Sequence, residues 1–327
     1  MAALLLLLLA AAGEVALRVV WGLGDPPLYV LDEQVEYLYK PSSSFTRMGN
    51  HVRINQWSMR ADEFPASKAD PRELRILLMG DSILAGGARI DQSDLASAVI
   101  GPELARISQR PVVVGNASAG SWGPPNLLAY AERFGFFEAD VVVLVLNSND
   151  YDDVPGLEPI GPQWPTRKPV LALQEVAQNY GPRLLARAGL GGRSAPPRTT
   201  THEQDVAHAL GALRDLIDLA RASGASVVLV QYLKLSELAA ARSEGGGGAE
   251  AGFSAIRAVA ESASVRTIDT SGAFAANGVP RANFFLPGDN VHPSAAGQRA
   301  MGALIVGAVV QELGLDRSAA EQPPGRD

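Results

Sequence analysis

The sequence of 327 residues contains no cysteine and only four histidines. Without cysteine the chain can form no disulfide, no thiolate metal site and no cysteine nucleophile, although this says little about its compartment. Basic residues are outnumbered, with 28 Lys and Arg against 35 Asp and Glu, and no basic stripe with interleaved aromatic side chains is present. The sequence therefore predicts no nucleic-acid partner.

Hydrophobic residues make up 47% of the chain and charged residues 19%, which is ordinary for a globular α/β protein. From residue 74 onward, short apolar runs alternate with helical patterns. This alternation predicts an α/β fold, a three-layer α/β/α sandwich around a five-stranded parallel sheet. The predicted strands are 74–79, 112–114, 141–146, 226–231 and 265–268, and the predicted helices are 92–109, 126–137, 202–223, 249–262 and 294–313.

The amino-terminal segment is unbroken apolar sequence from Ala2 to Ala12. This run is too short to span a bilayer alone, which takes about 20 residues. Three interpretations remain open. The segment is a secretory signal cleaved near Ala12, although it lacks a positive amino-terminal flank. Alternatively it is an uncleaved anchor that runs to Leu23, with Glu14 and Arg18 paired one helical turn apart. The third interpretation is a buried helix of a soluble protein.

Export or anchoring is the expectation that we carry forward, with the main domain outside the cytoplasm. The predicted organisation has four parts. They are a signal peptide or membrane anchor (1–23), an irregular lead-in packed on the main domain (24–70, with a linker at 66–71), the main domain (71–316) and a disordered tail (317–327). The main domain includes a Pro- and Gly-rich insertion at 151–200, expected to form a lid or substrate-facing loop, and a Gly-rich tether at 245–248.

The first candidate site is Gly80-Asp81-Ser82, which directly follows the buried strand. Glycine permits a sharp turn there, and ligands bind at the carboxyl ends of strands in open parallel sheets. A serine held in this turn can present its hydroxyl to a substrate. The tripeptide alone is weak evidence, because most such turns are structural. Asp81 is expected to cap backbone N–H groups.

The second candidate site lies near the other end of the chain, where Asp289 precedes His292 by three residues. A serine hydroxyl is a poor nucleophile until an imidazole removes its proton, and a carboxylate fixes the imidazole tautomer and stabilises its charged form. Ser82, His292 and Asp289 therefore predict nucleophilic catalysis if the fold brings them together.

Two further strand ends offer donors for the oxyanion that forms during acyl transfer. Small residues from Gly115 to Gly123 would let a backbone N–H approach the substrate, and Asn149 offers a side-chain amide. Asp150, like Asp81, is expected to be a structural capping residue. All of these turns would converge on one edge of a parallel sheet.

With these four stretches the chain resembles the SGNH/GDSL hydrolase superfamily, whose members carry four short blocks in this order and adopt a flavodoxin-like fold. The resemblance assigns Ser82 as nucleophile, Asp289 and His292 as its partners, and Ser82, Gly120 and Asn149 as the oxyanion hole. The third block usually begins with glycine, where this chain has Asn147. Either Gly120 or the adjacent Ser121 could supply the second N–H.

The resemblance implies a serine esterase that needs no organic cofactor and no metal, and that acts on a small-molecule or glycan ester. O-acetyl groups on an extracytoplasmic glycan are the suggested substrate. Two alternatives stay open: an O-acyltransferase that uses the same site with a sugar acceptor, and a non-catalytic component for glycan binding or assembly. The oligomeric state is not predicted. The other histidines, His51, His202 and His208, have no metal-ligand spacing.

Overall fold

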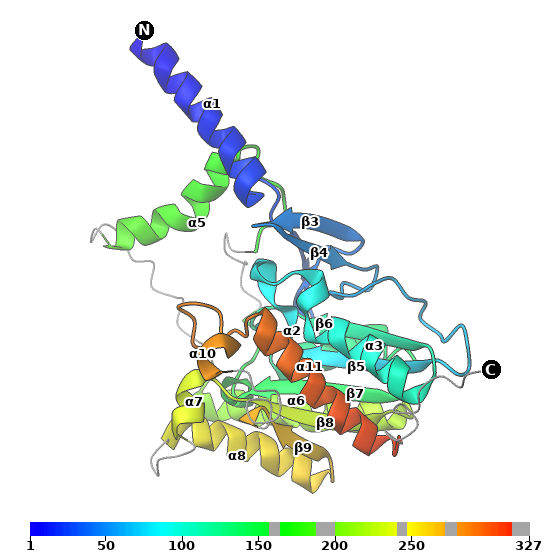
Figure 1. Cartoon of the computed structure of the whole chain (residues 1–327). Helices are drawn as coiled ribbons and strands as arrows, with labels where there is room; N and C mark the ends of the chain where they lie inside the picture. The colour runs from blue at the N-terminus through cyan, green and yellow to red at the C-terminus, as the bar shows by residue number, and fades with distance from the viewer. Residues whose placement is uncertain (157–163, 188–199, 241–246, 272–279, 316–327) are drawn as a thin grey trace, which may run out of the picture.

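A computed structural model describes residues 1–156, 164–187, 200–240, 247–271 and 280–315 (Figure 1). Its centre is a sheet in which five parallel strands lie in the order β6-β5-β7-β8-β9. Counted along the sheet-forming part of the chain, this is the flavodoxin-like order 2-1-3-4-5, which confirms the predicted fold class. The strands are β5 (Leu74–Gly80), β6 (Val112–Ser118), β7 (Val141–Asn147), β8 (Ser226–Tyr232) and β9 (Arg266–Asp269).

The strands are apolar on both faces because helices cover both sides of the sheet. In β5, Ile76 and Leu78 belong to one hydrophobic core, while Leu77 and Met79 belong to the other. The first core is closed by α2 (Ser82–Ala85), α3 (Ala96–Ser108) and α11 (Ala295–Glu312). The second is closed by α4 (Pro124–Phe134), α6 (His202–Ala222) and α8 (Gly247–Ser262).

The predicted elements are present with shifted boundaries, and two shifts matter. Strand β6 continues to Ser118, which pairs with Gly80, so residues 115–118 are strand and the turn begins only at Ala119. The end of this strand was not predicted, because it consists of small and polar residues and strand prediction relies on apolar runs. Helix α8 begins at Gly247, so the second half of the predicted 245–248 tether is helical. Residues 245 and 246 lie outside the described part.

The lead-in was predicted to be irregular, and this prediction is wrong. It forms two antiparallel hairpins, one from β1 (Tyr29–Asp32) and β2 (Glu36–Tyr39), the other from β3 (Ser43–Arg47) and β4 (Asn50–Ile54). Their aromatic side chains continue the core of the sheet, since the Tyr37 ring lies 6.4 Å from that of Trp122. Strands of four or five residues leave little periodicity to detect.

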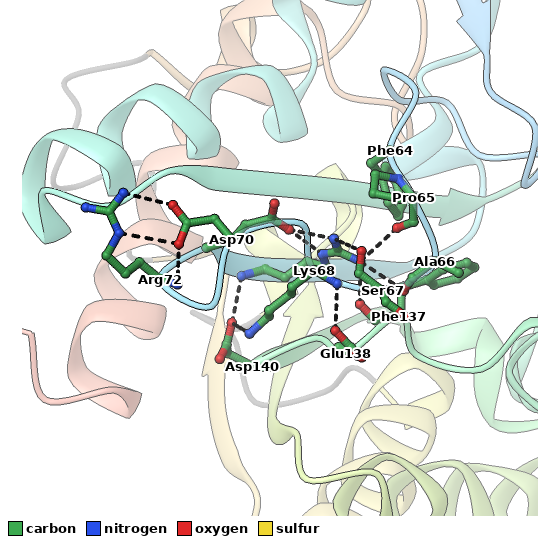
Figure 2. Close-up of polar contacts among 12 residues, drawn as sticks. Phe64, Pro65, Ala66, Ser67, Lys68, Asp70, Arg72, Phe137, Glu138 and Asp140 are labelled. Carbon is green, nitrogen blue, oxygen red and sulfur yellow. Dashed lines mark hydrogen bonds and ion pairs between the residues drawn. The ribbon is translucent and has the colours of Figure 1, made fainter.

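The predicted linker at 66–71 is instead held against the sheet (Figure 2). The Lys68 ammonium lies 2.7 Å from Asp140. The buried guanidinium of Arg75 donates to the carbonyls of Pro65, Ala66 and Phe137 at 2.7 to 3.0 Å. These bonds satisfy the carbonyls of a segment that has no regular structure, so the lead-in is joined rigidly to β5.

Helix α1 (Ala2–Trp21) has no buried residue, and among the described residues it alone is long and apolar enough to cross a membrane. The described middle of the predicted insertion is α5 (Ala172–Arg187), which packs against α1 away from α2 (Figure 1). The lid or substrate-facing role expected of the insertion stays a prediction. Residues 157–163 and 188–199 of the insertion, and the tail predicted at 317–327, lie outside the described residues.

Candidate active site

Ser82 begins helix α2 immediately after β5. A Cβ on Gly80 would lie 2.7 Å from the carbonyl oxygen of Val145 in the neighbouring strand, so only glycine fits at this strand end. The Asp81 carboxylate caps the helix by accepting a hydrogen bond from the backbone N–H of Ile83 at 2.8 Å. This is the capping role predicted for Asp81. The turn thus exposes the side chain of Ser82 at the carboxyl edge of the sheet.

The loop that carries His292 is tied down from several directions before α11 begins. The backbone N–H of Leu286 donates to the His292 carbonyl at 2.9 Å. The Tyr232 hydroxyl, at the end of β8, donates to the Val291 carbonyl at 2.6 Å. Ser294 then caps α11. These contacts fix the position of the imidazole relative to the sheet edge.

The structure brings Ser82, His292 and Asp289 together across 210 residues of sequence. The Ser82 Oγ lies 3.0 Å from His292 Nε2. The other ring nitrogen, Nδ1, lies 2.9 Å from Asp289 Oδ2. A neutral imidazole that donates from Nδ1 to the carboxylate has its lone pair on Nε2, directed at the hydroxyl. The arrangement can therefore take the hydroxyl proton and stabilise the resulting imidazolium.

Asp289 is held in its ionised form. Its Oδ1 accepts hydrogen bonds from the backbone N–H groups of Val291 and His292 at 2.9 and 3.0 Å. Its Oδ2 also accepts from the Arg89 guanidinium at 2.7 Å. Partial burial raises the pKa of Asp289, but these backbone donors outweigh it, with help from the His292 and Arg89 side chains. The net pKa lies well below the ordinary value, so Asp289 is a carboxylate at neutral pH.

A second acidic group, made of Asp81 and Asp150, is buried, and Asp81 directly precedes Ser82 in the chain. The Asn147 side-chain amide donates to Asp81 at 3.0 Å and to Asp150 at 3.2 Å, and the Asn147 backbone N–H donates to Asp150 at 2.7 Å. Burial raises the pKa of Asp81 to about 6 and raises that of Asp150 well above its usual range. Asp150 caps the turn as predicted.

The turn after β7 is the short 3₁₀ helix η3 (Ser148–Tyr151), which carries Asn149. The backbone N–H of Asn149 donates to the Oδ1 of Asn147 at 2.9 Å. Helix α8 packs closely beneath it, since a Cβ on Gly252 would lie 2.0 Å from the Ser148 carbonyl oxygen. The close contact with α8 therefore holds the turn that carries Asn149 in place.

Gly120 lies two residues beyond the end of β6, the neighbour of β5. A Cβ there would lie 3.7 Å from the Tyr37 hydroxyl of the lead-in. Ser121 follows with a positive φ of 56°. Because β5, β6 and β7 are adjacent and parallel, the turns that carry Ser82, Gly120 and Asn149 lie at one edge of the sheet.

The sequence alone does not reveal the roles of Arg89, Asn147 and Lys234. Asn147 was noted only as a departure from glycine, yet its amide separates two buried carboxylates. Lys234 donates to Asn149 Oδ1 at 2.8 Å, and its place two residues past the end of β8 was the available signal. Arg89 offered none, because its contact with Asp289 joins two loops that are far apart in sequence.

His202 is not simply solvated, since it contacts both the Tyr151 hydroxyl at 3.3 Å and Asp152 at 3.2 Å. Within the described ranges, no group of three His, Asp or Glu side chains is arranged to hold a metal ion.

A sequence profile of the GDSL-like lipase/acylhydrolase family matches residues 78–300, which is more than half of the chain. The chain belongs to this family. As a GDSL-like acylhydrolase it is an enzyme that hydrolyses ester bonds, and its substrate contains an ester. The matched region begins within β5 and ends within α11, so it includes every turn at the sheet edge described above.

Among solved structures, the chain is similar to the acetylxylan esterase Axe2 of Geobacillus stearothermophilus, in the form of a catalytic mutant. The identity is 17% and the TM-score 0.45, over 75% of this chain and 95% of that one. It is also similar to an acylhydrolase, described as putative, of Bacteroides fragilis, with 16% identity and a TM-score of 0.43 over 77% of this chain and 92% of that one. No curated protein matches the sequence.

Proposed function

We propose that this GDSL-like acylhydrolase uses Ser82 as nucleophile, His292 as general base and Asp289 as the group that orients and stabilises His292. The observation that supports this proposal most directly is the continuous chain of contacts from Ser82 Oγ to His292 Nε2 at 3.0 Å and from His292 Nδ1 to Asp289 Oδ2 at 2.9 Å. The lowered pKa of Asp289 keeps the orienting group ionised at neutral pH.

In the first half of the reaction, His292 Nε2 takes the proton of Ser82 while Oγ forms a bond to the ester carbonyl carbon. The tetrahedral intermediate collapses as its C–O bond to the alcohol breaks, and the imidazolium returns its proton to the leaving oxygen. Water then attacks the acyl-enzyme and gives a proton to His292. The bond between Ser82 Oγ and the acyl carbon breaks, and the carboxylic acid leaves. His292 returns its proton to Oγ, which restores the serine hydroxyl.

The oxyanion would accept hydrogen bonds from the backbone N–H groups of Ser82 and Gly120 and from the side-chain amide of Asn149. This assignment is supported by the position of all three residues just past the ends of adjacent parallel strands. Donors that are fixed before the reaction stabilise the developing charge without reorganisation, and removal of one typically costs about 10²–10³ in kcat.

For the substrate we propose an O-acetyl group on a glycan outside the cytoplasm. This rests on the proposed location of the catalytic domain and on the exposure of the site, since 37% of the His292 side chain is exposed. An open site can admit a large alcohol, whereas a long acyl chain would need an enclosed apolar pocket. The alternative is transfer of the acyl group to a sugar acceptor instead of water. The ester experiment below distinguishes the two reactions.

For the location we propose that α1 is a retained membrane anchor and not a cleaved signal. The helix is connected to the folded body: Glu14 accepts hydrogen bonds from the backbone N–H groups of Ala172 and Leu173 at the start of α5. Arg18 donates to the Val170 carbonyl at 2.8 Å. Cleavage near Ala12 would place Glu14 and Arg18 at a new chain end, where helices fray, and would so weaken these contacts with α5.

An exposed apolar stripe on the same side also favours a bilayer. Leu173 and Leu184 are exposed at 38% and 62% and lie on one face of α5, next to α1, which has no buried residue. The expected result is a chain that needs detergent for extraction from membranes and that keeps its first 21 residues by intact mass. A soluble product that lacks them would contradict retention.

The catalytic proposal is tested with p-nitrophenyl esters of increasing acyl length, run for the wild type and for Ser82→Ala. Among these esters the wild type should hydrolyse p-nitrophenyl acetate fastest, and Ser82→Ala should lower the activity by about 10³-fold or more. Hydrolysis that continues unchanged in Ser82→Ala would contradict the assignment. An added sugar acceptor that raises turnover and appears acylated in the products would identify transfer.

A further inference from the structure

Lys234 lies just past the end of β8, beside the turn that carries Asn149. In the sheet, Asn147 of β7 pairs with Tyr232 of β8. Asn149 and Lys234 each follow two residues later, so the two chains continue side by side beyond the sheet edge. The Lys234 ammonium donates to the Oδ1 of Asn149 at 2.8 Å.

The ammonium itself is held in place by Glu237. The distance from Lys234 Nζ to Glu237 Oε1 is 3.1 Å, and the Lys234 backbone N–H donates to Oε2 at 2.7 Å. The Ser148 hydroxyl donates to the same carboxylate. The side chains of Lys234 and Glu237 are only 14% and 5% exposed. A long lysine side chain is therefore held in place here, with its charge paired and two of its three donors assigned to Asn149 and Glu237.

The chemistry of the two groups decides which end of the Asn149 amide faces which way. An ammonium donates hydrogen bonds and accepts none, so the amide oxygen must face Lys234. The Nδ2 group then points away from Lys234, and among the described residues none accepts a hydrogen bond from it. A donor left free at the edge that carries Ser82 is what an oxyanion requires.

We infer that Lys234 is a positioning residue for the proposed oxyanion hole, a role that rests on the proposed function of Asn149. It prevents rotation of the amide that would turn its oxygen toward the oxyanion. Its donation to Oδ1 also polarises the amide, because hydrogen bonds in a chain strengthen one another. The residue does not touch the substrate and acts only through Asn149.

The test is a double-mutant cycle with Lys234→Met and Asn149→Ala, with kcat and KM measured on p-nitrophenyl acetate. In the wild-type background Lys234→Met should lower kcat by about 10- to 100-fold, less than loss of the donor itself, which is worth about 10²–10³. The KM should change less than about threefold. In the Asn149→Ala background the same change should alter kcat by less than about threefold, because interacting residues are not additive.

Lys234→Met leaves Glu237 buried without its cation, which could destabilise the fold by itself. The double change Lys234→Met with Glu237→Gln removes both charges and keeps an acceptor for the backbone N–H. It should show the same loss of kcat. Lys68→Met is the matched control, because Lys68 is a similarly buried lysine, 17% exposed and paired with Asp140 2.7 Å away (Figure 2). Its kcat should equal that of the wild type.

An unchanged kcat in Lys234→Met, or an equal loss in both Asn149 backgrounds, would overturn the role of Lys234. If Asn149→Ala still lowers kcat in that case, the proposed oxyanion hole stands without Lys234. If Asn149→Ala has no effect, both assignments fail together, while the Ser82→Ala result continues to report on the nucleophile.

Discussion

Two acidic groups flank the same serine, and their environments differ sharply. Asp289 is partly exposed, accepts two backbone N–H groups, and shares its Oδ2 between His292 and Arg89. Asp81 and Asp150 are buried and share the side-chain amide of Asn147, and each accepts one backbone N–H besides. The pKa is lowered in the first group and raised in the second. Hydrogen-bond donors and burial, not distance to Ser82, decide which acid can support a charged imidazole.

The largest effect that this comparison predicts is on activity. Asp289→Asn should lower kcat/KM by about 10³-fold or more, because the imidazole loses its orienting charge and its tautomer is no longer fixed. Asp81→Asn retains an oxygen that can accept from the Ile83 N–H, and it should stay within about tenfold of the wild type. Steady-state kinetics on p-nitrophenyl acetate measure both. Equal losses in the two variants would remove the distinction between the two acidic groups.

The second effect is on stability. The pKa of Asp81 in the folded chain, about 6, lies above its ordinary value of 3.8, so the folded state binds the proton more tightly. The contribution of Asp81 to stability therefore falls as the pH rises from about 4 through about 6. Asn147→Ala removes a donor from the ionised forms of Asp81 and Asp150 and should make this fall steeper.

We expect Asn147→Ala to destabilise the fold by about 1–3 kcal/mol, with a larger loss at pH 8 than at pH 5. Urea denaturation at the two pH values measures the difference. Ser118→Ala is a useful control, since it removes a buried hydrogen bond to Asn116 with no carboxylate involved. Its loss should be the same at both pH values. An equal loss for Asn147→Ala at pH 5 and pH 8 would show that the carboxylates are not coupled to this amide.

The smallest effect concerns Arg89. Arg89→Met should change kcat/KM on p-nitrophenyl acetate by less than about threefold, because Asp289 keeps its two backbone donors and an exposed ion pair contributes little. Arg299→Met is the matched control, since Arg299 is a similarly exposed arginine paired with Asp94, and its kcat/KM should equal that of the wild type. A loss in Arg89→Met as large as that in Asp289→Asn would contradict this minor role of Arg89.

The sequence was informative where local pattern determines structure. The apolar runs of β5 and β7 predicted a sheet covered on both faces, and the parallel order brought Ser82 and His292 to one edge. Strand β6 was predicted too short because its second half lacks large apolar residues. The hairpins of the lead-in were missed because their strands are short and their aromatic side chains pack on residues far along the chain.

Contacts between side chains of different loops could not be predicted. The bond between Lys234 and Asn149 depends on the register of β7 against β8, which no pattern within either strand reveals. The bond between Arg89 and Asp289 joins positions 200 residues apart. The role of Asn147 depends on two carboxylates that become neighbours only when β5 and β7 pair.

The most direct test of the serine mechanism is covalent labelling with a fluorophosphonate, followed by intact mass measurement and peptide mapping. One adduct per chain should form on the peptide that contains Ser82, and His292→Ala should slow its formation strongly, because the hydroxyl then has no base. Absence of labelling in folded protein, an adduct on another residue, or an unchanged rate in His292→Ala would contradict this account.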